Sequence, residues 1–173
     1  MRILIDVNHP AHVHLFKNLS WELENRGHEV SWTARPRDII SDLLDKYGFR
    51  YEMLTTPGKG YINLAKELVK RDIRLFKFAS DFKPDIMIGT SVCITHVGRL
   101  SKAISVVFNE DNIDIRKLSL ICYPFADAIC TPDCFENSLG KKHIKYPSYH
   151  ELAYLHPSRF TPNPEIHKKL GLS

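Results

Sequence analysis

The chain has 173 residues, a hydrophobic content of 43% and a formal net charge of +4. It is long enough for one complete α/β domain with a sizeable core, and its hydrophobic content is ordinary for a globular protein. The positive charge suits phosphorylated ligands or an anionic membrane surface, but it is too small for a dedicated nucleic-acid-binding protein. We therefore expect no nucleic-acid partner.

The first predicted element is a buried strand. The apolar run at 2–5 follows Met1 directly and is rich in branched residues, which is typical of a strand covered on both faces. No long apolar segment of the signal-peptide or membrane-spanning type precedes it, which favours a cytoplasmic location. Four cysteines without paired spacing are predicted to be buried thiols in a reducing compartment: Cys93, Cys122, Cys130 and Cys134.

A helix is predicted immediately after this strand. Apolar residues recur at helical spacing from Val13 to Leu23, and Gly27 is suited to a left-handed helix end after Arg26. Pro10 fits the first helical position, where its missing N–H group costs nothing. His12 then lies in the first turn, where the positive end of the helix dipole favours a neutral imidazole that can accept a proton.

Strand-like and helical patterns alternate along the rest of the chain. Strands are predicted at 28–33, 50–54, 86–89, 105–108, 128–130 and 143–146, and helices at 38–47, 61–82, 93–100 and 116–123. The helix at 38–47 is expected to turn four residues inward: Ile39, Ile40, Leu43 and Leu44. This alternation predicts an α/β fold with a doubly wound, mostly parallel, Rossmann-like sheet and helices on both faces.

The helix at 61–82 is amphipathic and basic. Apolar residues that include Leu68 and Phe76 are predicted on one side, and most of its cations on the other: Lys66, Lys70, Arg71, Arg74 and Lys77. Two interpretations remain open. The helix is either an ordinary crossover with its charged face in solvent, or a surface for peripheral contact with anionic lipid.

The end of the chain differs in composition. Pro157, Pro162 and Pro164 predict an extended linker, and the residues after it resemble the opening of a further helix. We expect a Rossmann-like domain over 1–156, followed at 157–173 by a linker and the start of a second domain that this chain lacks. The alternative is a short C-terminal helix that docks back on the sheet.

Polar residues follow several predicted strands, and the carboxyl edge of a parallel sheet is where open α/β proteins bind ligands. His12 is the candidate catalytic base. The candidate substrate-binding residues are Asn8, His9, His14, Thr90, Ser91, Glu110 and Asn112. Helix capping is the competing interpretation for most of them, and packing is the alternative for His14, which lies two helical positions beyond His12.

A metal site is a competing interpretation of the histidine cluster. His12 and His14 would share one face in an extended strand and could chelate an ion there. The helical periodicity of the following residues argues against that geometry, and no second group with metal-ligand spacing occurs later in the chain. We therefore predict no metal and no resident cofactor.

Two segments carry a resemblance to a known superfamily: the start at 2–6 with the run from His9 to Lys17, and the run from Tyr146 to Leu155. The chain resembles the N-terminal domain of GT-B-type glycosyltransferases and of related sugar epimerases, and these two segments are most similar to an uncharacterised prokaryotic family of that superfamily. A more distant likeness is to the N-acetylglucosaminyltransferase that completes the lipid-linked peptidoglycan precursor, in which a glycine-rich first turn ends in a histidine followed by Val. Later segments of that enzyme resemble Lys83 to Ser91 and Asn109 to Asn112.

The resemblance implies a metal-independent enzyme that moves a sugar from a nucleotide sugar to a glycan or lipid-linked acceptor. This chain would be the acceptor-side half, inactive alone, and the missing domain would hold the nucleotide. The N-terminal domain of the peptidoglycan enzyme also associates with the membrane. The family glycines of the first turn are replaced here by Asn8, His9 and Pro10. A nucleotide-sugar epimerase and a non-catalytic nucleotide- or sugar-binding module remain the alternatives.

Overall fold

A computed structural model describes residues 1–55, 61–110 and 120–171. Within them, seven strands form one sheet in the order β3-β2-β1-β4-β5-β6-β7, and all neighbours are parallel. The strands are β1 (Arg2–Val7), β2 (Glu29–Ala34), β3 (Tyr51–Met53), β4 (Ile86–Gly89), β5 (Ile104–Phe108), β6 (Ala128–Pro132) and β7 (His143–Tyr146). The predicted doubly wound, Rossmann-like α/β fold is confirmed.

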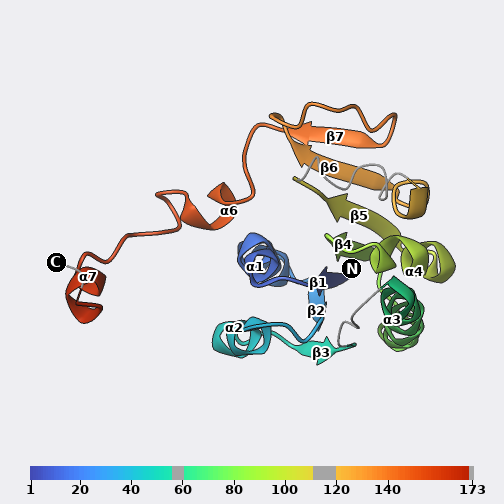
Figure 1. Ribbon diagram of the computed structural model, residues 1–173, viewed down its shortest axis with the longest axis horizontal. Helices are drawn as coiled ribbons and strands as arrows, with labels where there is room; N and C mark the ends of the chain where they lie inside the picture. Colours follow the sequence, from blue (N-terminus) through green and yellow to red (C-terminus); the bar gives the residue numbers. More distant parts are fainter. Residues whose placement is uncertain (56–60, 111–119, 172–173) are drawn as a thin grey trace.

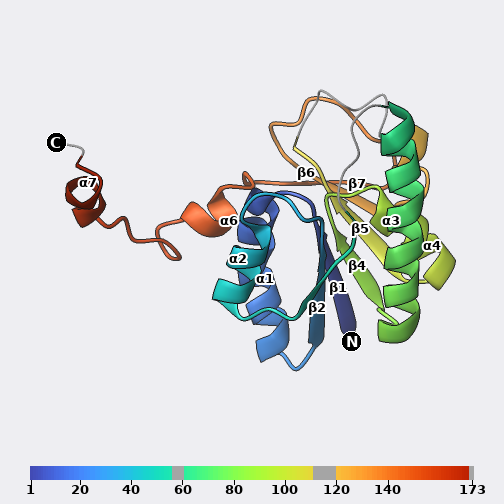
Figure 2. The same cartoon turned by 60° about the horizontal axis from the view of Figure 1, so that its bottom comes forward.

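Helices cover both faces of the sheet. One face packs against α1 (Pro10–Asn25) and α2 (Ile40–Tyr47), and the other against α3 (Tyr61–Phe82) and α4 (Cys93–Ser101), as Figures 1 and 2 show. Ile3 and Ile5 of β1 belong to the first core, whereas Leu4 belongs to the second. Because successive strand residues point to opposite faces, a strand buried on both faces needs the nearly continuous apolar run that the sequence shows.

The ends of α1 follow from local chemistry. His9 is the N-terminal cap, and its Nδ1 accepts the N–H group of Ala11 at 3.2 Å, while Pro10 occupies the first helical position. At the other end, Gly27 has a φ of +79°, and the N–H group of His28 donates to the carbonyl of Leu23 at 3.0 Å. A left-handed residue of this kind ends a helix with little strain only when it is glycine.

Three sequence predictions need correction or fall outside the described residues. The predicted helix at 116–123 lies largely outside them, since 116–119 are not described. Ile39 is 53% exposed rather than inward, because α2 begins at Ile40 and Ile39 precedes its apolar stripe. Cys134 is exposed, in contrast to the other three cysteines, because it lies beyond the end of β6.

The basic helix α3 also departs from the prediction. Its inward stripe consists of Glu67, Arg71, Leu75 and Ala79, all buried, while Phe76 is 40% exposed. Arg71, predicted on the solvent side, is only 1% exposed. The four buried positions are spaced four residues apart, so they share one face of the helix. Because α3 runs antiparallel to the strands, its N-terminal half lies nearest the carboxyl edge of the sheet. Glu67 and Arg71, the charged members of the stripe, are in that half.

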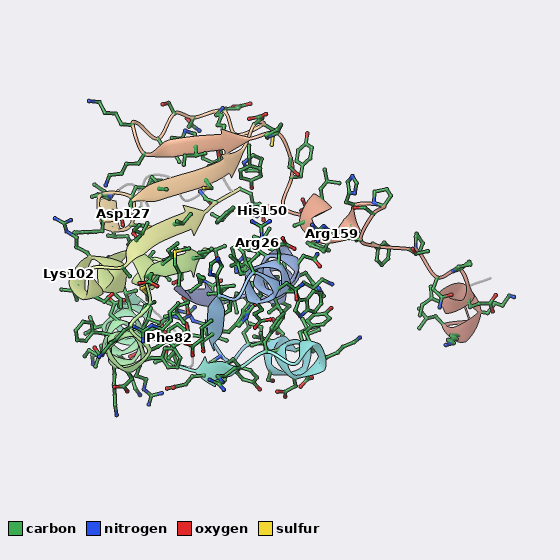
Figure 3. The ribbon with its side chains drawn as sticks, turned by 180° about the vertical axis from the view of Figure 1, so that it is seen from behind. Arg26, Phe82, Lys102, Asp127, His150 and Arg159 are labelled. Carbon is green, nitrogen blue, oxygen red and sulfur yellow. The ribbon has the colours of Figure 1, made fainter. Side chains whose placement is uncertain are left out.

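The chain returns from β7 to the first layer of helices. Figure 3 places His150 where the segment after β7 crosses toward α1, and α6 (Leu152–Leu155) follows. Asn18 of α1 donates its Nδ2–H to the carbonyl of Ala153 at 2.7 Å, which fixes this return. Residues 156–171 then extend away from the sheet and end in α7 (Glu165–Lys169), which stands apart in both ribbon views (Figures 1 and 2).

Candidate functional site

A cavity of about 630 Å³ opens at the carboxyl edge of the sheet, bordered by the segments that follow β1, β2, β4 and β5. The chain proceeds outward from β1 to β2 and β3, then returns to place β4 on the other side of β1. The boundary between β1 and β4 is therefore the topological switch point of the sheet, where the loops diverge and leave a crevice.

Most of the predicted site residues meet in this cavity. Six of them line it: Asn8, His9, His12, Thr90, Ser91 and Glu110. Asn112 lies outside the described residues. His14 lies elsewhere, with its Nδ1 3.3 Å from the hydroxyl of Tyr47 and its ring 5.3 Å from that of Tyr154. Its offset from His12 along the helix turns it toward α2 and α6, in agreement with the packing alternative.

His12 is held beside the end of β4. Its Nδ1 is 2.8 Å from Oγ1 of Thr90, and its ring centre is 5.7 Å from that of His9. Burial lowers the pKa of His12 from 6.5 to about 4, and electrostatic interactions with the neighbouring His9 and His150 act in the same direction. The carboxylate of Asp6 acts against them. The prediction of a neutral imidazole is confirmed in direction, but the leading cause is burial rather than the helix dipole.

The contact with Thr90 is compatible with a tautomer in which the other ring nitrogen acts as a base. A neutral imidazole carries one proton, so when Nδ1–H donates to Oγ1 of Thr90, Nε2 keeps its lone pair. In this tautomer Nε2 can accept a proton from a hydroxyl group in the cavity. Thr90 immediately follows Gly89, which pairs with Asp6 across β1 and β4, so the position of the hydroxyl is fixed by the sheet itself.

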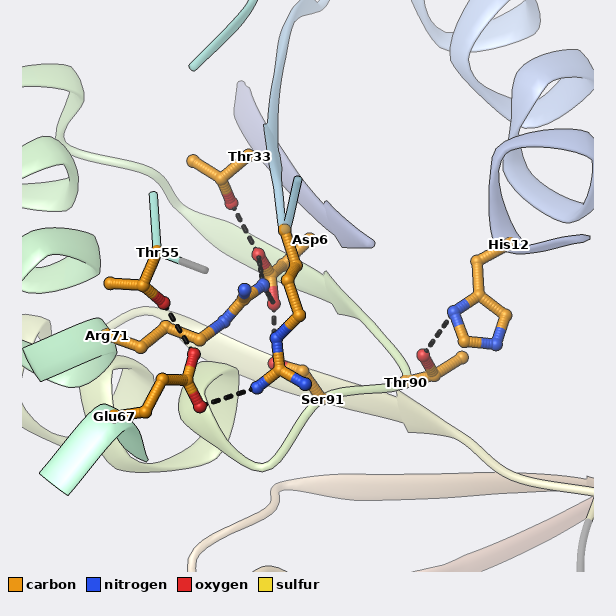
Figure 4. Close-up of polar contacts among 9 residues, drawn as sticks. Asp6, His12, Thr33, Thr55, Glu67, Arg71, Thr90 and Ser91 are labelled. Carbon is orange, nitrogen blue, oxygen red and sulfur yellow. Dashed lines mark hydrogen bonds and ion pairs between the residues drawn. The ribbon is translucent and has the colours of Figure 1, made fainter. Parts of the chain in front are cut away.

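A buried charge network lies behind His12. Asp6 is completely buried, and it accepts hydrogen bonds from Thr33 at 2.8 Å, from Ser91 at 2.5 Å, and from Nη2 of Arg71 at 2.8 and 3.0 Å (Figure 4). Burial lowers the pKa of Arg71, but the charge and hydrogen bonds of Asp6, together with the charge of Glu67, act against burial, and the net change in pKa is upward. Asp6 and Arg71 therefore form a buried ion pair.

A second ion pair lies beside the first. Nη2 of Arg35 is 2.7 Å from a carboxylate oxygen of Glu67, whose other oxygen accepts the hydroxyl of Thr55 at 2.5 Å (Figure 4). Arg35 follows β2 and Glu67 lies on α3, so the pair ties these two elements together at the cavity wall. Arg37 also lines the cavity, but its side chain is 53% exposed and is therefore at the rim.

Gly89 permits the close approach of β4 to β1 at the site. A Cβ atom built on Gly89 would lie 2.3 Å from the carbonyl oxygen of Asp6. That contact is with backbone, so no side-chain rotation relieves it, and any larger residue would force the two strands apart. The glycine thus maintains the spacing that brings Thr90 and Ser91 beside the residues that follow β1.

A further acid–base pair faces the cavity from the opposite side. Nδ1 of His150 is 2.8 Å from Oε2 of Glu110, and His150 is only 6% exposed. His150 belongs to the run from Tyr146 to Leu155, one of the segments that carry the superfamily resemblance. Because it is distant in sequence from the other site residues, no local pattern marks it as part of the cavity.

Sequence reasoning also missed the cavity arginines, Arg35, Arg37 and Arg71. A signal for Arg71 was present, because Glu67 and Arg71 occupy positions of α3 at which helical spacing requires inward residues. As for metals, no group of three or more His, Cys, Asp or Glu side chains is placed to hold an ion within the residues that the structure describes.

The fold is that of a Rossmann-like α/β protein with a cavity at its switch point. A family model matches residues 1–173, and the chain belongs to that family, Protein of unknown function (DUF354). A curated relative from Pseudomonas paraeruginosa, UDP-N-acetylglucosamine–N-acetylmuramyl-(pentapeptide) pyrophosphoryl-undecaprenol N-acetylglucosamine transferase, is 28% identical over 138 residues, which are 72% of this chain and 39% of the relative. This chain therefore spans well under half the length of that enzyme.

Solved structures share the fold. Acinetobacter baumannii MurG superimposes with a TM-score of 0.64 and 16% identity, covering 83% of this chain and 45% of MurG. The UDP-GlcNAc 2-epimerase from Neisseria meningitidis, solved with bound UDP-GlcNAc, superimposes with a TM-score of 0.57 and 10% identity, covering 74% of this chain and 40% of the epimerase. The resemblance to GT-B glycosyltransferases and related epimerases is thereby confirmed at the level of fold.

Proposed function

We propose that this chain is the acceptor-side part of a GT-B-type glycosyltransferase, which moves a sugar from a nucleotide sugar to a hydroxyl group of a glycan or lipid-linked acceptor. The observation that carries the proposal is the contact between His12 and Thr90 at the switch-point cavity. With Nδ1–H donating to Oγ1 of Thr90, Nε2 of a neutral imidazole is available to remove the acceptor proton as the glycosidic bond forms. The relationship to the Pseudomonas transferase supports the same reaction.

The other residues of the cavity support this role. Asn8, Thr90 and Glu110 supply hydrogen-bonding groups at the carboxyl ends of three strands, where they can bind sugar or acceptor hydroxyls. The chemistry uses His12 as the base and requires no metal. We assign the nucleotide to a second domain beyond residues 1–156, since this chain matches only 39% of the transferase and 45% of MurG.

The test uses the full-length protein with a panel of nucleotide sugars and candidate acceptors. Acceptor-dependent release of nucleotide indicates transfer, a changed sugar in the recovered nucleotide sugar indicates epimerisation, and binding without either product indicates a binding module. The substitution His12→Gln should lower the transfer rate by about 10²- to 10⁴-fold, the range usual for a lost general base. His156→Ala, at an exposed histidine beyond α6, is the matched control and should leave the rate unchanged.

The epimerase remains the second candidate because an epimerase shares this fold. The cavity also contains two proton-transfer groups on different elements, His12 and the pair of His150 with Glu110. Conversion of the nucleotide sugar to its epimer, without net release of nucleotide, would favour the epimerase. Full transfer activity in His12→Gln would refute the catalytic role of His12 in the transferase.

We also propose that α3 contacts a membrane surface. No described helix is long and apolar enough to cross a membrane. The outer side of α3 exposes Val69, Ile73 and Phe76, which are 59%, 64% and 40% exposed, and the exposed Lys66 and Lys70 lie beside them. Apolar residues beside lysines suit a peripheral contact with anionic lipid, in keeping with a lipid-linked acceptor.

Ile73→Ser should weaken cosedimentation with phosphatidylglycerol vesicles, and unchanged cosedimentation would refute the contact.

A further inference from the structure

Three arginines border the cavity: Arg35, Arg37 and Arg71. Arg71 is paired with Asp6 and Arg35 with Glu67 in the cavity wall, and a third carboxylate at the cavity, that of Glu110, is paired with His150. The third arginine, Arg37 at the rim, forms an ion pair at 3.2 Å with an exposed aspartate, Asp38. Such an exposed pair is weak because solvent and salt screen it, so the rim guanidinium is available to a ligand.

Arg71 is the central group of this cluster. Its side chain is 1% exposed, and a single nitrogen, Nη2, contacts both oxygens of Asp6. Its other two nitrogens, Nε and Nη1, are buried and have no hydrogen-bond acceptor among residues 1–55, 61–110 and 120–171, and the same holds for Nε of Arg35. Buried donors in folded proteins are nearly always paired, so these N–H groups are suited to an acceptor that a ligand supplies.

The neighbouring carboxylates already accept hydrogen bonds at every oxygen. The oxygens of Asp6 accept from Thr33 and Ser91 in addition to Arg71, and those of Glu67 accept from Thr55 and Arg35. These bonds hold both carboxylates against the wall. The remaining guanidinium N–H groups therefore favour an anionic oxygen from the cavity side, where charge-assisted hydrogen bonds are strong.

We propose that Arg71, with Arg35 and Arg37, forms an oxyanion site that binds a phosphate or carboxylate group of the acceptor. The oxyanion site stands on the arginine cluster alone, and its assignment to the acceptor rests on the proposed function. His12 and Arg71 line one cavity, so the acceptor presents a hydroxyl to the first and an anionic group to the second. The substrate class is thereby narrowed to acidic acceptors.

The first experiment measures binding of inorganic pyrophosphate, inorganic phosphate and citrate to the full-length protein by calorimetry at constant ionic strength. The double substitution Asp6→Asn with Arg71→Gln replaces the ion pair by neutral groups of similar size, which avoids leaving a buried charge. It should weaken binding of the preferred anion at least about tenfold, and Arg37→Gln about threefold. Arg26→Gln, at an exposed ion pair with Glu22 at the far end of α1, should leave binding unchanged.

The outcomes distinguish a phosphorylated acceptor from a carboxylated one, and they test the oxyanion site separately from the proposed glycosyl transfer. Tighter binding of pyrophosphate or phosphate assigns a phosphorylated acceptor, and tighter binding of citrate assigns a carboxylated one. No binding of any of the three, or equal binding by the double variant, would overturn the oxyanion site. In the transfer assay, Arg37→Gln should raise the KM for the acceptor; a rise only in the KM for the nucleotide sugar would overturn the assignment to the acceptor. Anion binding without any transfer would refute the proposed function alone.

Discussion

The pKa of His12 makes the stability of this protein depend on pH in a way that His12→Gln should remove. Burial is the main reason why this pKa is lowered from 6.5 to about 4 in the folded protein, whereas the unfolded chain keeps the ordinary value. Between these two values the unfolded state binds a proton that the native state does not. The free energy of unfolding therefore falls as the pH falls from above 6.5 toward 4, and it is unaffected by His12 at higher pH.

The size of the effect follows from the two pKa values. Each pKa unit corresponds to about 1.4 kcal/mol, so the depressed pKa of His12 lowers the free energy of unfolding by about 3 kcal/mol once the pH has reached about 4. A typical domain is stable by only about 5–15 kcal/mol, so this contribution is readily measured. Carboxylates also titrate in this pH range, and they contribute equally to the wild type and to His12→Gln. The difference in the free energy of unfolding between the two proteins therefore reports the contribution of His12.

Urea unfolding at pH 7.5, 6.0, 5.0 and 4.5 measures this difference. The free energy of unfolding of the wild type should fall more steeply with decreasing pH than that of His12→Gln, and the two curves should diverge only below about pH 6.5. His156→Gln, at an exposed position, should follow the wild type. Parallel curves for wild type and His12→Gln would show that His12 titrates normally, and the physical argument for a neutral buried base would fail.

Three further substitutions test the surroundings of His12. Thr90→Val removes the hydroxyl at Nδ1 of His12 while keeping the side-chain shape, and should lower kcat about tenfold with a change of about 1 kcal/mol in the free energy of unfolding. Gly89→Ala should destabilise the protein by about 2 kcal/mol, because its Cβ meets the carbonyl oxygen of Asp6. Arg71→Met should cost about 3–5 kcal/mol, because Asp6 is left as an uncompensated buried charge.

Controls distinguish these effects from general damage. Thr90→Ser keeps the hydroxyl and should restore most of the activity lost in Thr90→Val; equal loss in both would show that the hydroxyl does not position the ring. Gly140→Ala has open space around its Cβ and should cost only the strain of a positive φ, about 1 kcal/mol. The double variant with Asp6→Asn and Arg71→Gln should be more stable than Arg71→Met, because it leaves no unpaired buried charge. The reverse order of stability would show that the unpaired charge of Asp6 is not what destabilises Arg71→Met.

The order of the elements was accessible from sequence because each pattern has a local physical cause. The apolar run of β1 reflects a strand covered on two faces, and α1 begins and ends where Pro10 and Gly27 allow. The loops after parallel strands open at one edge, so the meeting of His12, Thr90 and Glu110 could be predicted. These inferences need only neighbours in sequence and the geometry of a parallel sheet.

Other features depend on distances that sequence spacing does not encode. Helical spacing indicates that Arg71 lies on the inward side of α3, but only the packing of that helix on the sheet brings it to Asp6, 65 residues away. His150 reaches Glu110 because the chain after β7 crosses back to α1, a path fixed by tertiary contacts such as that of Asn18 with Ala153. Ile39 was predicted inward because periodicity does not locate the first residue of a helix to within one position.

By itself, the sequence determined the parallel α/β architecture, the histidine at the start of the first helix and the edge of the sheet at which the cavity opens, since each follows from local periodicity and chain direction. Only the tertiary structure decided that burial keeps His12 neutral, that Thr90 contacts its ring, and that Arg71 pairs with Asp6 at the cavity. The physical reason is that pKa values and hydrogen bonds depend on the groups that folding brings within a few ångströms, and these come from strands and helices far apart in the chain.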